Sequence, residues 1–194
     1  MRICTPITKA FFYKPGEKPE AVALPHTWNA LDGQDGENDY FRGTCYYAKK
    51  LLREDLPAAD RYYLEINGAN SSADLYLNGN KLAHHDGGYS TWRADMTDLL
   101  EAVNLIVIAV DNAPNETVYP QMADFTFYGG LYRDVSIICV NDAHFDLDYF
   151  GGAGIAVTPE IQGDNAKELS DIYMPVFGMV KNGYGFFGSI ETSA

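Results

Sequence analysis

Short strand-like runs, each followed by turn residues, limit the folds open to this chain. Residues 61–66 and 72–77 alternate apolar and polar side chains with a period of two, as half-buried β-strands do. Asn78-Gly79 follows the second run at once and is a strong signal for a two-residue hairpin. Residues 81–84 are therefore expected to form the returning strand. Strands of this length and spacing predict an antiparallel β-sandwich or barrel.

Three further runs extend the β pattern. Strands are predicted at residues 44–52 and at residues 133–140, a run rich in β-branched side chains. Residues 104–110 are continuously apolar, which predicts a strand buried on both faces. The one helical signal is a single turn over residues 95–100, with Asp95 as N-cap and Asp98 in its first turn.

The net charge of the chain restricts the kinds of molecule that it can bind. The 194 residues carry 14 Lys and Arg against 27 Asp and Glu, a net charge of −13. Such a balance repels phosphate backbones and anionic lipid, so neither nucleic acid nor membrane is expected as a partner. The longest apolar run, residues 105–110, is far shorter than the roughly 20 residues of a membrane-spanning helix.

The N-terminus and the cysteines bear on the compartment. Pro6 interrupts the chain before an apolar leader develops, which predicts a cytoplasmic protein. Cys4, Cys45 and Cys139 are far apart and are expected to be reduced, buried thiols. If a leader has been removed, a secreted or periplasmic protein with a Cys45–Cys139 bridge is the alternative.

Neither a metal site nor a cofactor is expected. The chain has no C-x-x-C pair and no phosphate-binding glycine loop. His84 and His85 are adjacent on a predicted strand, so their side chains point to opposite faces and do not converge on one ion.

Composition changes near residue 141. The last 44 residues hold 8 of the 18 glycines, and residues 141–194 contain only two basic residues. We therefore divide the chain into a first domain, 1–140, and a segment, 141–194. An immunoglobulin-like sandwich takes about 100 residues, so this segment is too short to close one.

Two long connections, residues 25–42 and 113–130, are crowded with aromatic and polar side chains. Loops of this length are usually functional surfaces, and a binding or docking face is expected here. Aromatic faces with neighbouring amides and carboxylates suit sugars, but the same aromatics also suit the capping of a sandwich. The residues alone leave both interpretations open.

Several motifs follow one another along the first 140 residues. They are Leu24-Pro25-His26-Thr27-Trp28-Asn29, Tyr40-Phe41-Arg42-Gly43, Leu75-Tyr76-Leu77-Asn78-Gly79, Gly87-Gly88-Tyr89, Asp95-Met96-Thr97, Asp111-Asn112 and the run from Asp124 to Val135. Their order and spacing resemble glycoside hydrolase family 2, the β-galactosidase and β-glucuronidase group. The resemblance implies that residues 1–140 form a jelly-roll β-sandwich, the galactose-binding-like, sugar-binding N-terminal domain of that family. Residues 141–194 resemble a linker and the first strands of an incomplete immunoglobulin-like domain.

The resemblance also implies where catalysis takes place. In this family the two catalytic glutamates lie on a TIM barrel, which needs about 250 residues. We therefore expect no catalytic residue in this chain and no hydrolysis by the chain alone. The implied function is that of a non-catalytic domain that helps to shape the carbohydrate pocket of a β-galactosidase-like enzyme. A free-standing carbohydrate-binding module and a purely structural support domain are the alternatives.

Site residues follow from the matched motifs. Asp124 matches the family aspartate that reaches from this domain into the active site and contacts the sugar; a loop-capping role is the alternative. Trp28, Asn29 and Tyr128 are the further expected contacts to a β-galactoside-like carbohydrate. Structural roles are expected for Arg42 and Arg133, as buried forks that pair loop carboxylates, and for Gly129 and Gly130, through backbone conformation. A homo-oligomer through the C-terminal segment is also expected.

Overall fold

The computed structural model describes residues 2–32, 40–120, 123–148, 151–152, 155–157, 174–178 and 186–190. The chain divides into two compact units, Met1–Val140 and Asn141–Ala194. None of the helices in this described part is long and apolar enough to cross a membrane.

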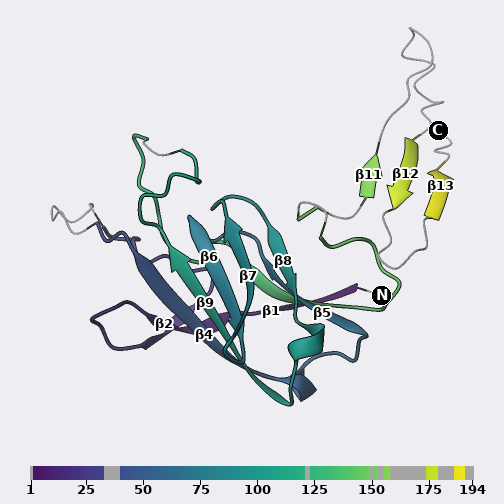
Figure 1. The fold of residues 1–194 in the computed structure, drawn as a ribbon, viewed down its shortest axis with the longest axis horizontal. Helices are drawn as coiled ribbons and strands as arrows, with labels where there is room; N and C mark the ends of the chain where they lie inside the picture. The colour runs from purple at the N-terminus through teal and green to yellow at the C-terminus, as the bar shows by residue number, and fades with distance from the viewer. Residues whose placement is uncertain are drawn as a thin grey trace, which may run out of the picture. The chain divides into compact units, whose positions relative to one another are not determined.

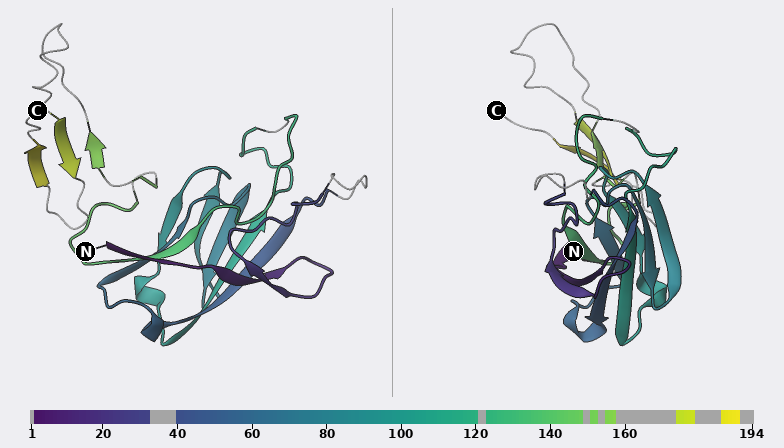
Figure 2. Two further views of the ribbon diagram at one scale, coloured as in Figure 1. Left: turned by 180° about the vertical axis from the view of Figure 1, so that it is seen from behind. Right: turned by 90° about the vertical axis from the view of Figure 1, so that its left-hand side faces the viewer.

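The first unit is a β-sandwich of two antiparallel sheets packed face to face (Figures 1 and 2). The larger sheet has the strand order β3-β2-β4-β9-β6-β7, and the smaller has the order β1-β10-β5-β8. The chain crosses from one sheet to the other at most of its connections, as in a jelly roll. The strands are β1 (Arg2–Pro6), β2 (Lys9–Tyr13), β3 (Glu20–Ala23), β4 (Thr44–Leu52), β5 (Arg61–Ile66), β6 (Ser72–Leu77), β7 (Asn80–Asp86), β8 (Trp92–Asp95), β9 (Val103–Asp111) and β10 (Val135–Val140).

The second unit contains one described sheet, of three antiparallel strands in the order β11-β12-β13. Its strands are β11 (Ile155–Val157), β12 (Met174–Gly178) and β13 (Phe186–Ile190). The all-β fold predicted from the sequence is confirmed.

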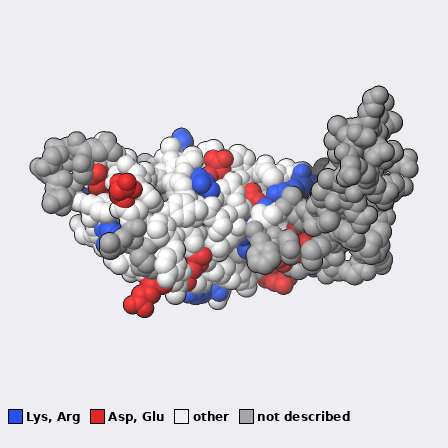
Figure 3. Space-filling model, turned by 90° about the horizontal axis from the view of Figure 1, so that it is seen from above, with Lys and Arg blue, Asp and Glu red and all other residues white. Residues whose placement is uncertain are grey.

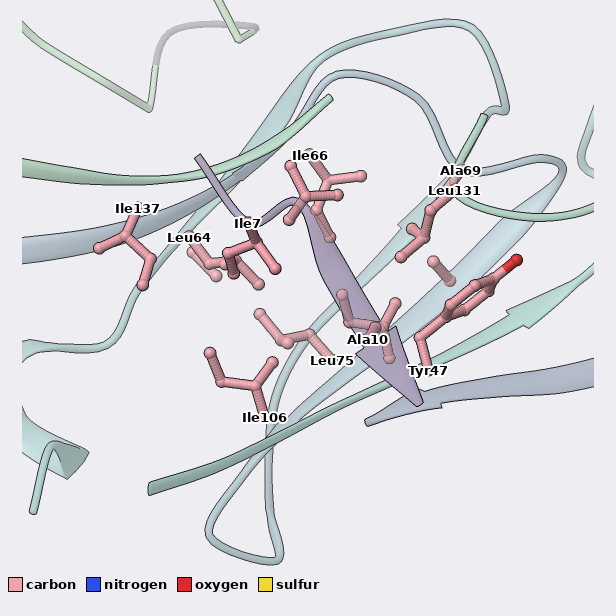
Figure 4. Packing of buried hydrophobic residues seen from close by; sticks show 14 of the residues in the cluster. Ile7, Ala10, Tyr47, Leu64, Ile66, Ala69, Leu75, Ile106, Leu131 and Ile137 are labelled. Atoms are coloured by element: carbon pink, nitrogen blue, oxygen red, sulfur yellow. The ribbon is translucent and has the colours of Figure 1, made fainter. Parts of the chain in front are cut away.

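The core lies between the two sheets of the first unit. Inward-facing residues alternate along each strand, and β6 contributes Ala73, Leu75 and Leu77. Opposite them, β5 and β10 contribute Leu64, Ile66 and Ile137 (Figure 4). Apolar burial of this kind supplies most of the free energy that holds such a sandwich together.

Two strands are buried differently from the prediction. Strand β9 is buried on one face only: Ile106 and Ile108 lie in the core, but Leu105 is 49% exposed. The outer face of the larger sheet explains this, because no further layer of the first unit covers Leu105 in the described residues. Strand β5 is instead buried on both faces, with Tyr63 and Glu65 on the side away from the core cluster.

Burial of a carboxylate on β5 requires a counter-charge. The Glu65 carboxylate accepts a hydrogen bond from Arg93 Nε at 2.6 Å and lies 3.4 Å from Arg2 Nη2. Arg93 stands on the neighbouring strand β8, in register with Glu65. The two guanidinium groups thus offset the cost of removing this carboxylate from water.

The predicted hairpin is confirmed. Asn78 and Gly79 both have positive φ, 52° and 83°, as a type I′ turn requires. Strand β7 returns from Asn80 and pairs with β6.

The predicted helical turn is shorter than expected. Only a 3₁₀ turn, η2 (Thr97–Leu99), forms, and Asp95 belongs to β8 instead of standing at the N-cap. The Asp95 carboxylate still accepts a hydrogen bond from the Thr97 backbone N–H at 2.9 Å. A second 3₁₀ turn, η1 (Arg53–Asp55), links β4 to β5.

Cys45 and Cys139 are buried free thiols, and Cys4 is exposed. The expectation that all three thiols are buried is therefore wrong for Cys4, which lies on the edge strand β1. Burial raises the pKa of the Cys45 thiol to about 12, so this thiol stays protonated and is a poor nucleophile at neutral pH.

Charged side chains are scattered over the upper face of the molecule. In the view from above, Lys and Arg lie among Asp and Glu, with wide uncharged areas between them (Figure 3). Charge does not single out a site on this face, so hydrogen bonding and burial have to identify one.

Candidate functional site

The two long connections singled out in the sequence meet at one end of the sandwich. Backbone hydrogen bonds join them: His26 N–H donates to the Leu131 carbonyl at 2.8 Å. The Thr27 hydroxyl donates to the Gly129 carbonyl at 2.8 Å. The β5–β6 connection joins them through Asn70 N–H, which donates to the Gly130 carbonyl at 3.2 Å.

Asn29 lies at the centre of this arrangement and is fully buried. Its amide Nδ2 donates to Asp32 Oδ2 at 2.5 Å and to the Phe41 carbonyl at 2.9 Å. Its Oδ1 accepts from Gly129 N–H at 2.7 Å and from Asn112 Nδ2 at 3.1 Å. All four hydrogen-bonding positions of the amide are occupied.

Asn112 completes the same network from the end of β9. It is also fully buried, and its Oδ1 accepts from Gly43 N–H at 2.9 Å. Its Nδ2 donates to the Phe127 carbonyl at 3.0 Å as well as to Asn29. Two asparagine side chains therefore tie residues 29–32, 40–43 and 127–129 to one strand end.

A glycine is needed at position 129 because there is no room for a side chain, and not because of its backbone conformation. A Cβ atom built at Gly129 would lie 2.0 Å from Cζ2 of Trp28, whose ring stacks on Phe12 with centroids 6.0 Å apart. Its backbone φ is not positive, so the expected conformational role is wrong for Gly129.

Gly130 does have the conformation expected of it, with φ of 124°. It is also tightly enclosed, because a Cβ there would approach the His26 carbonyl oxygen to 2.6 Å and the Tyr47 hydroxyl to 2.7 Å. Both requirements favour glycine at this position.

Tyr47 and His26 form the floor below Gly130. The Tyr47 hydroxyl and His26 Nδ1 are 2.8 Å apart. Burial lowers the pKa of His26 and raises that of Tyr47, so both are neutral at pH 7. With both groups neutral, the pair forms one hydrogen bond without charge, which is a structural role.

The two arginines do not pair with carboxylates of the described residues. Arg42 Nε donates to the Asn112 carbonyl at 2.7 Å, and its guanidinium lies 5.0 Å from the centre of the Phe127 ring. Arg133 is exposed and donates to the Tyr89 carbonyl at 2.8 Å. The expected buried fork is therefore wrong for both, because a backbone carbonyl and an aromatic ring take the place of the carboxylate.

The predicted sugar contacts divide into two groups. Asn29 and Trp28 pack behind Gly129, and Asn29 has no free polar position for a sugar hydroxyl. Asp124 and Tyr128 lie on the other connection, and both are exposed. The structure thus divides the four residues into a pair that packs against Gly129 and a pair that faces solvent.

The sequence alone assigned no role to two residues of this network, Asn112 and Asn70. Asn112 follows a strand directly, and Asn70, whose Nδ2 donates to the Tyr128 carbonyl at 2.9 Å, precedes one. An asparagine beside a strand end is a signal for a side chain that binds loop backbone. Which loop it binds depends on the fold.

The crevice between the two loops is too small to hold a sugar. The crevice there, lined by residues that include Arg42, Tyr89, Tyr119 and Phe127, has a volume of about 10 Å³. Such a volume holds about one water molecule. Two of its lining residues, Tyr89 and Tyr119, are exposed.

The two antiparallel sheets and the loop network at one end define a jelly-roll β-sandwich domain. The family model "Glycosyl hydrolase 2 galactose-binding domain-like" matches residues 37–134. The chain therefore belongs to glycoside hydrolase family 2, as its motifs indicated.

Individual relatives agree with this assignment. The chain is 35% identical over 154 residues to a β-glucuronidase of Bacteroides fragilis, covering 78% of this chain and 22% of that enzyme. It is 27% identical over 168 residues to a β-galactosidase of Thermoanaerobacter pseudethanolicus, covering 79% of this chain and 23% of that enzyme. The chain spans about a fifth of the length of the curated relatives that it matches.

A solved structure shows the same fold. The FMN-binding β-glucuronidase from Facaelibacterium prausnitzii L2-6 superposes with a TM-score of 0.82 at 41% identity, covering 94% of this chain and 28% of that one.

The network makes a prediction about two of the proposed sugar contacts. Asn29→Ala leaves the Gly129 N–H and the Asn112 amide without their buried acceptor, so it should lower the free energy of unfolding by about 2–4 kcal/mol. Asp124→Ala removes an exposed side chain and should change it by no more than about 0.5 kcal/mol. Urea denaturation of both variants measures the difference, and equal losses would contradict the division into buried and exposed residues.

Proposed function

We propose that the chain acts as a non-catalytic domain of a family 2 glycoside hydrolase and helps to form the carbohydrate pocket of the complete enzyme. The observation that supports this proposal is a contrast between buried and exposed residues within the 113–130 connection. Residues 127–130 are held by buried hydrogen bonds, whereas Asp124 on the same segment is exposed. A rigid base under an exposed carboxylate suits a group that reaches into a site formed with another domain.

Asp124 is the residue to which we assign the sugar contact. An exposed carboxylate accepts hydrogen bonds from sugar hydroxyls in two directions, and no side-chain partner among the described residues competes for it. Trp28 and Asn29 contribute indirectly, because they fix the position of the Gly129 backbone. Tyr128, on the same connection as Asp124, adds an exposed aromatic side chain.

The small crevice between the loops supports an accessory role over that of a free-standing sugar-binding module. A site of about 10 Å³ does not enclose a sugar ring. Tyr119 and Phe125 remain 75% and 52% exposed, although the Phe125 ring lies 5.3 Å from the Phe127 ring. We therefore propose that these aromatics pack against the domain that completes the pocket. A β-galactoside or β-glucuronide is the substrate class that the names of the relatives suggest.

A chimera tests this function. The matched fifth of the Bacteroides fragilis β-glucuronidase is replaced by this chain, and hydrolysis of nitrophenyl glycosides is measured. The chimera should be active, and Asp124→Ala should lower its kcat/KM about 10- to 100-fold, as loss of a hydrogen bond to a charged group does. The isolated chain should hydrolyse neither substrate.

Asp134→Ala is the matched control, since Asp134 is an exposed aspartate on the same connection. It should leave kcat/KM unchanged. The proposal fails if the active chimera tolerates Asp124→Ala, or if the isolated chain shows turnover that mutation of one of its own carboxylates abolishes.

A homo-oligomer through the C-terminal segment belongs to the same proposal. Strands β11 and β13 are the outer strands of the described sheet of Asn141–Ala194. Outer strands offer unpaired backbone groups to a second chain. The net charge of −13 opposes association at low salt. Light scattering at moderate ionic strength should therefore give a dimer or larger species for the full chain and a monomer for residues 1–140; two monomers would contradict it.

A further inference from the structure

A second polar cluster lies on the outer face of the larger sheet, next to the start of the 113–130 connection. A groove of about 610 Å³ runs over β4, β9, β6 and β7 and is walled by residues 113–117. Its lining includes Asp74, His84, Asp86, Asp111 and Thr117. The proposed function assigns no role to any of these five side chains.

His84 stands between two carboxylates in this groove. Its Nδ1 lies 2.6 Å from Asp74 Oδ1, and its Nε2 lies 3.2 Å from Asp86 Oδ1. A neutral imidazole carries one N–H, so one of its nitrogens would then face a carboxylate oxygen as a second acceptor. Only the imidazolium form donates to both carboxylates.

Asp86 in turn contacts residues 113–117, which form one side of the groove. Its Oδ1 accepts from the Ser72 hydroxyl at 2.6 Å. Its Oδ2 lies 3.1 Å from the Thr117 hydroxyl, whose one proton is shared with Asn115 Oδ1 at 2.7 Å. Asn115 reinforces the same contact, since its Nδ2 donates to Ser72 Oγ at 2.8 Å and its Oδ1 accepts from Thr117 N–H at 2.8 Å. The segment from Asn115 to Thr117 is thus docked on β6 and β7 through Asp86 and Ser72.

The charges around His84 are mostly negative. Asp74 and Asp86 contact it, Asp111 and Glu116 line the same groove, and Lys81 Nζ is 2.8 Å from Asp74 Oδ1. With His84 protonated, two positive charges face four carboxylates. After deprotonation only Lys81 remains, and the carboxylates repel one another and the Glu116-bearing wall.

We propose that His84 is a proton-controlled clasp: its imidazolium holds Asp86 against the 113–118 segment, and its deprotonation releases that segment from the sheet. The released segment continues into residues 123–130, which carry Asp124. The state of the clasp therefore changes how firmly the N-terminal end of that connection is held, while the Asn29 and Asn112 network holds the other end.

The electrostatics of the groove give the direction of the effect. The hydrogen bond to Asp74 is the largest contribution that raises the pKa of His84 above its ordinary value of 6.5, and Asp86 adds to it. A group whose pKa is raised by folding contributes stability at acidic pH and loses it as pH rises through that pKa. The 113–118 segment should therefore be docked more firmly near pH 5.5 than near pH 8.5.

His85, the next residue, provides an internal reference. Its ring stacks on Trp92 at a centroid distance of 5.3 Å, and burial lowers its pKa. The two adjacent histidines should therefore titrate on opposite sides of 6.5, which distinguishes the clasp from a general effect of pH on β7.

Hydrogen exchange and histidine NMR on the full chain test the proposal. After correction for the intrinsic pH dependence of exchange, protection of the amides of residues 115–118 should fall about two- to fivefold between pH 5.5 and 8.5, the effect of one partly exposed ion pair. The midpoint should coincide with the titration of the His84 ring. Constant protection across this range would overturn the proposal.

Three variants separate the clasp from other causes. His84→Gln should give, at every pH, the low amide protection that the unchanged chain shows at pH 8.5. His144→Gln is the same change outside the groove, and it should keep the fall in protection between pH 5.5 and 8.5, which we call the pH step. Thr117→Val, which retains the shape of the side chain but removes its hydroxyl, should also abolish the step. A step that survives in His84→Gln would assign it to another group and refute the clasp.

Discussion

Two buried asparagine side chains, Asn29 and Asn112, hold the loop end of the sandwich together. A primary amide offers two donors and two acceptor positions, and at this site every one of them on Asn29 is used inside the protein. An amide left unpaired in such a place would cost roughly 1–3 kcal/mol. The network therefore forms as a whole, and the segments that it joins have one arrangement.

The position of the candidate sugar contact depends on this network. Asp124 itself makes no side-chain contact with the described residues that would fix it, so its place is set by the chain on either side. On the C-terminal side, Phe127, Gly129 and Gly130 are held by Asn112, Asn29 and Asn70. On the N-terminal side, Thr117 and Asn115 bind Asp86 and Ser72. The first anchor is built on the buried amides of Asn29 and Asn112, and the second lies in an acidic groove.

Much of the sandwich follows from local sequence, because alternation and turn chemistry act over a few residues. Strands β4, β5 and β6 have the predicted bounds, and the Asn78-Gly79 turn has the predicted conformation. Strands β1, β2, β3 and β8 were not predicted, since they are only four or five residues long. Burial of β5 on both faces and of β9 on one was also missed, because burial depends on which elements cover a sheet.

The site was predictable as a region but not as a set of roles. Aromatic and polar crowding in residues 25–42 and 113–130 indicated that both connections form one functional face. The roles of Asn29, Arg42 and Gly129 depend on contacts between residues about 70 to 100 positions apart, which no local pattern encodes. Gly129 illustrates this, since the reason for a glycine is the Trp28 ring behind it.

The exchange rate of one amide proton tests the central claim most directly. Gly129 lies in a loop, yet its N–H donates to the buried Asn29 Oδ1 at 2.7 Å. If the asparagine network fixes this segment, the Gly129 amide should exchange as slowly as amides in the paired strand β9. Exchange at the rate of the exposed Phe125 amide would show that the segment is not held, and would contradict the account.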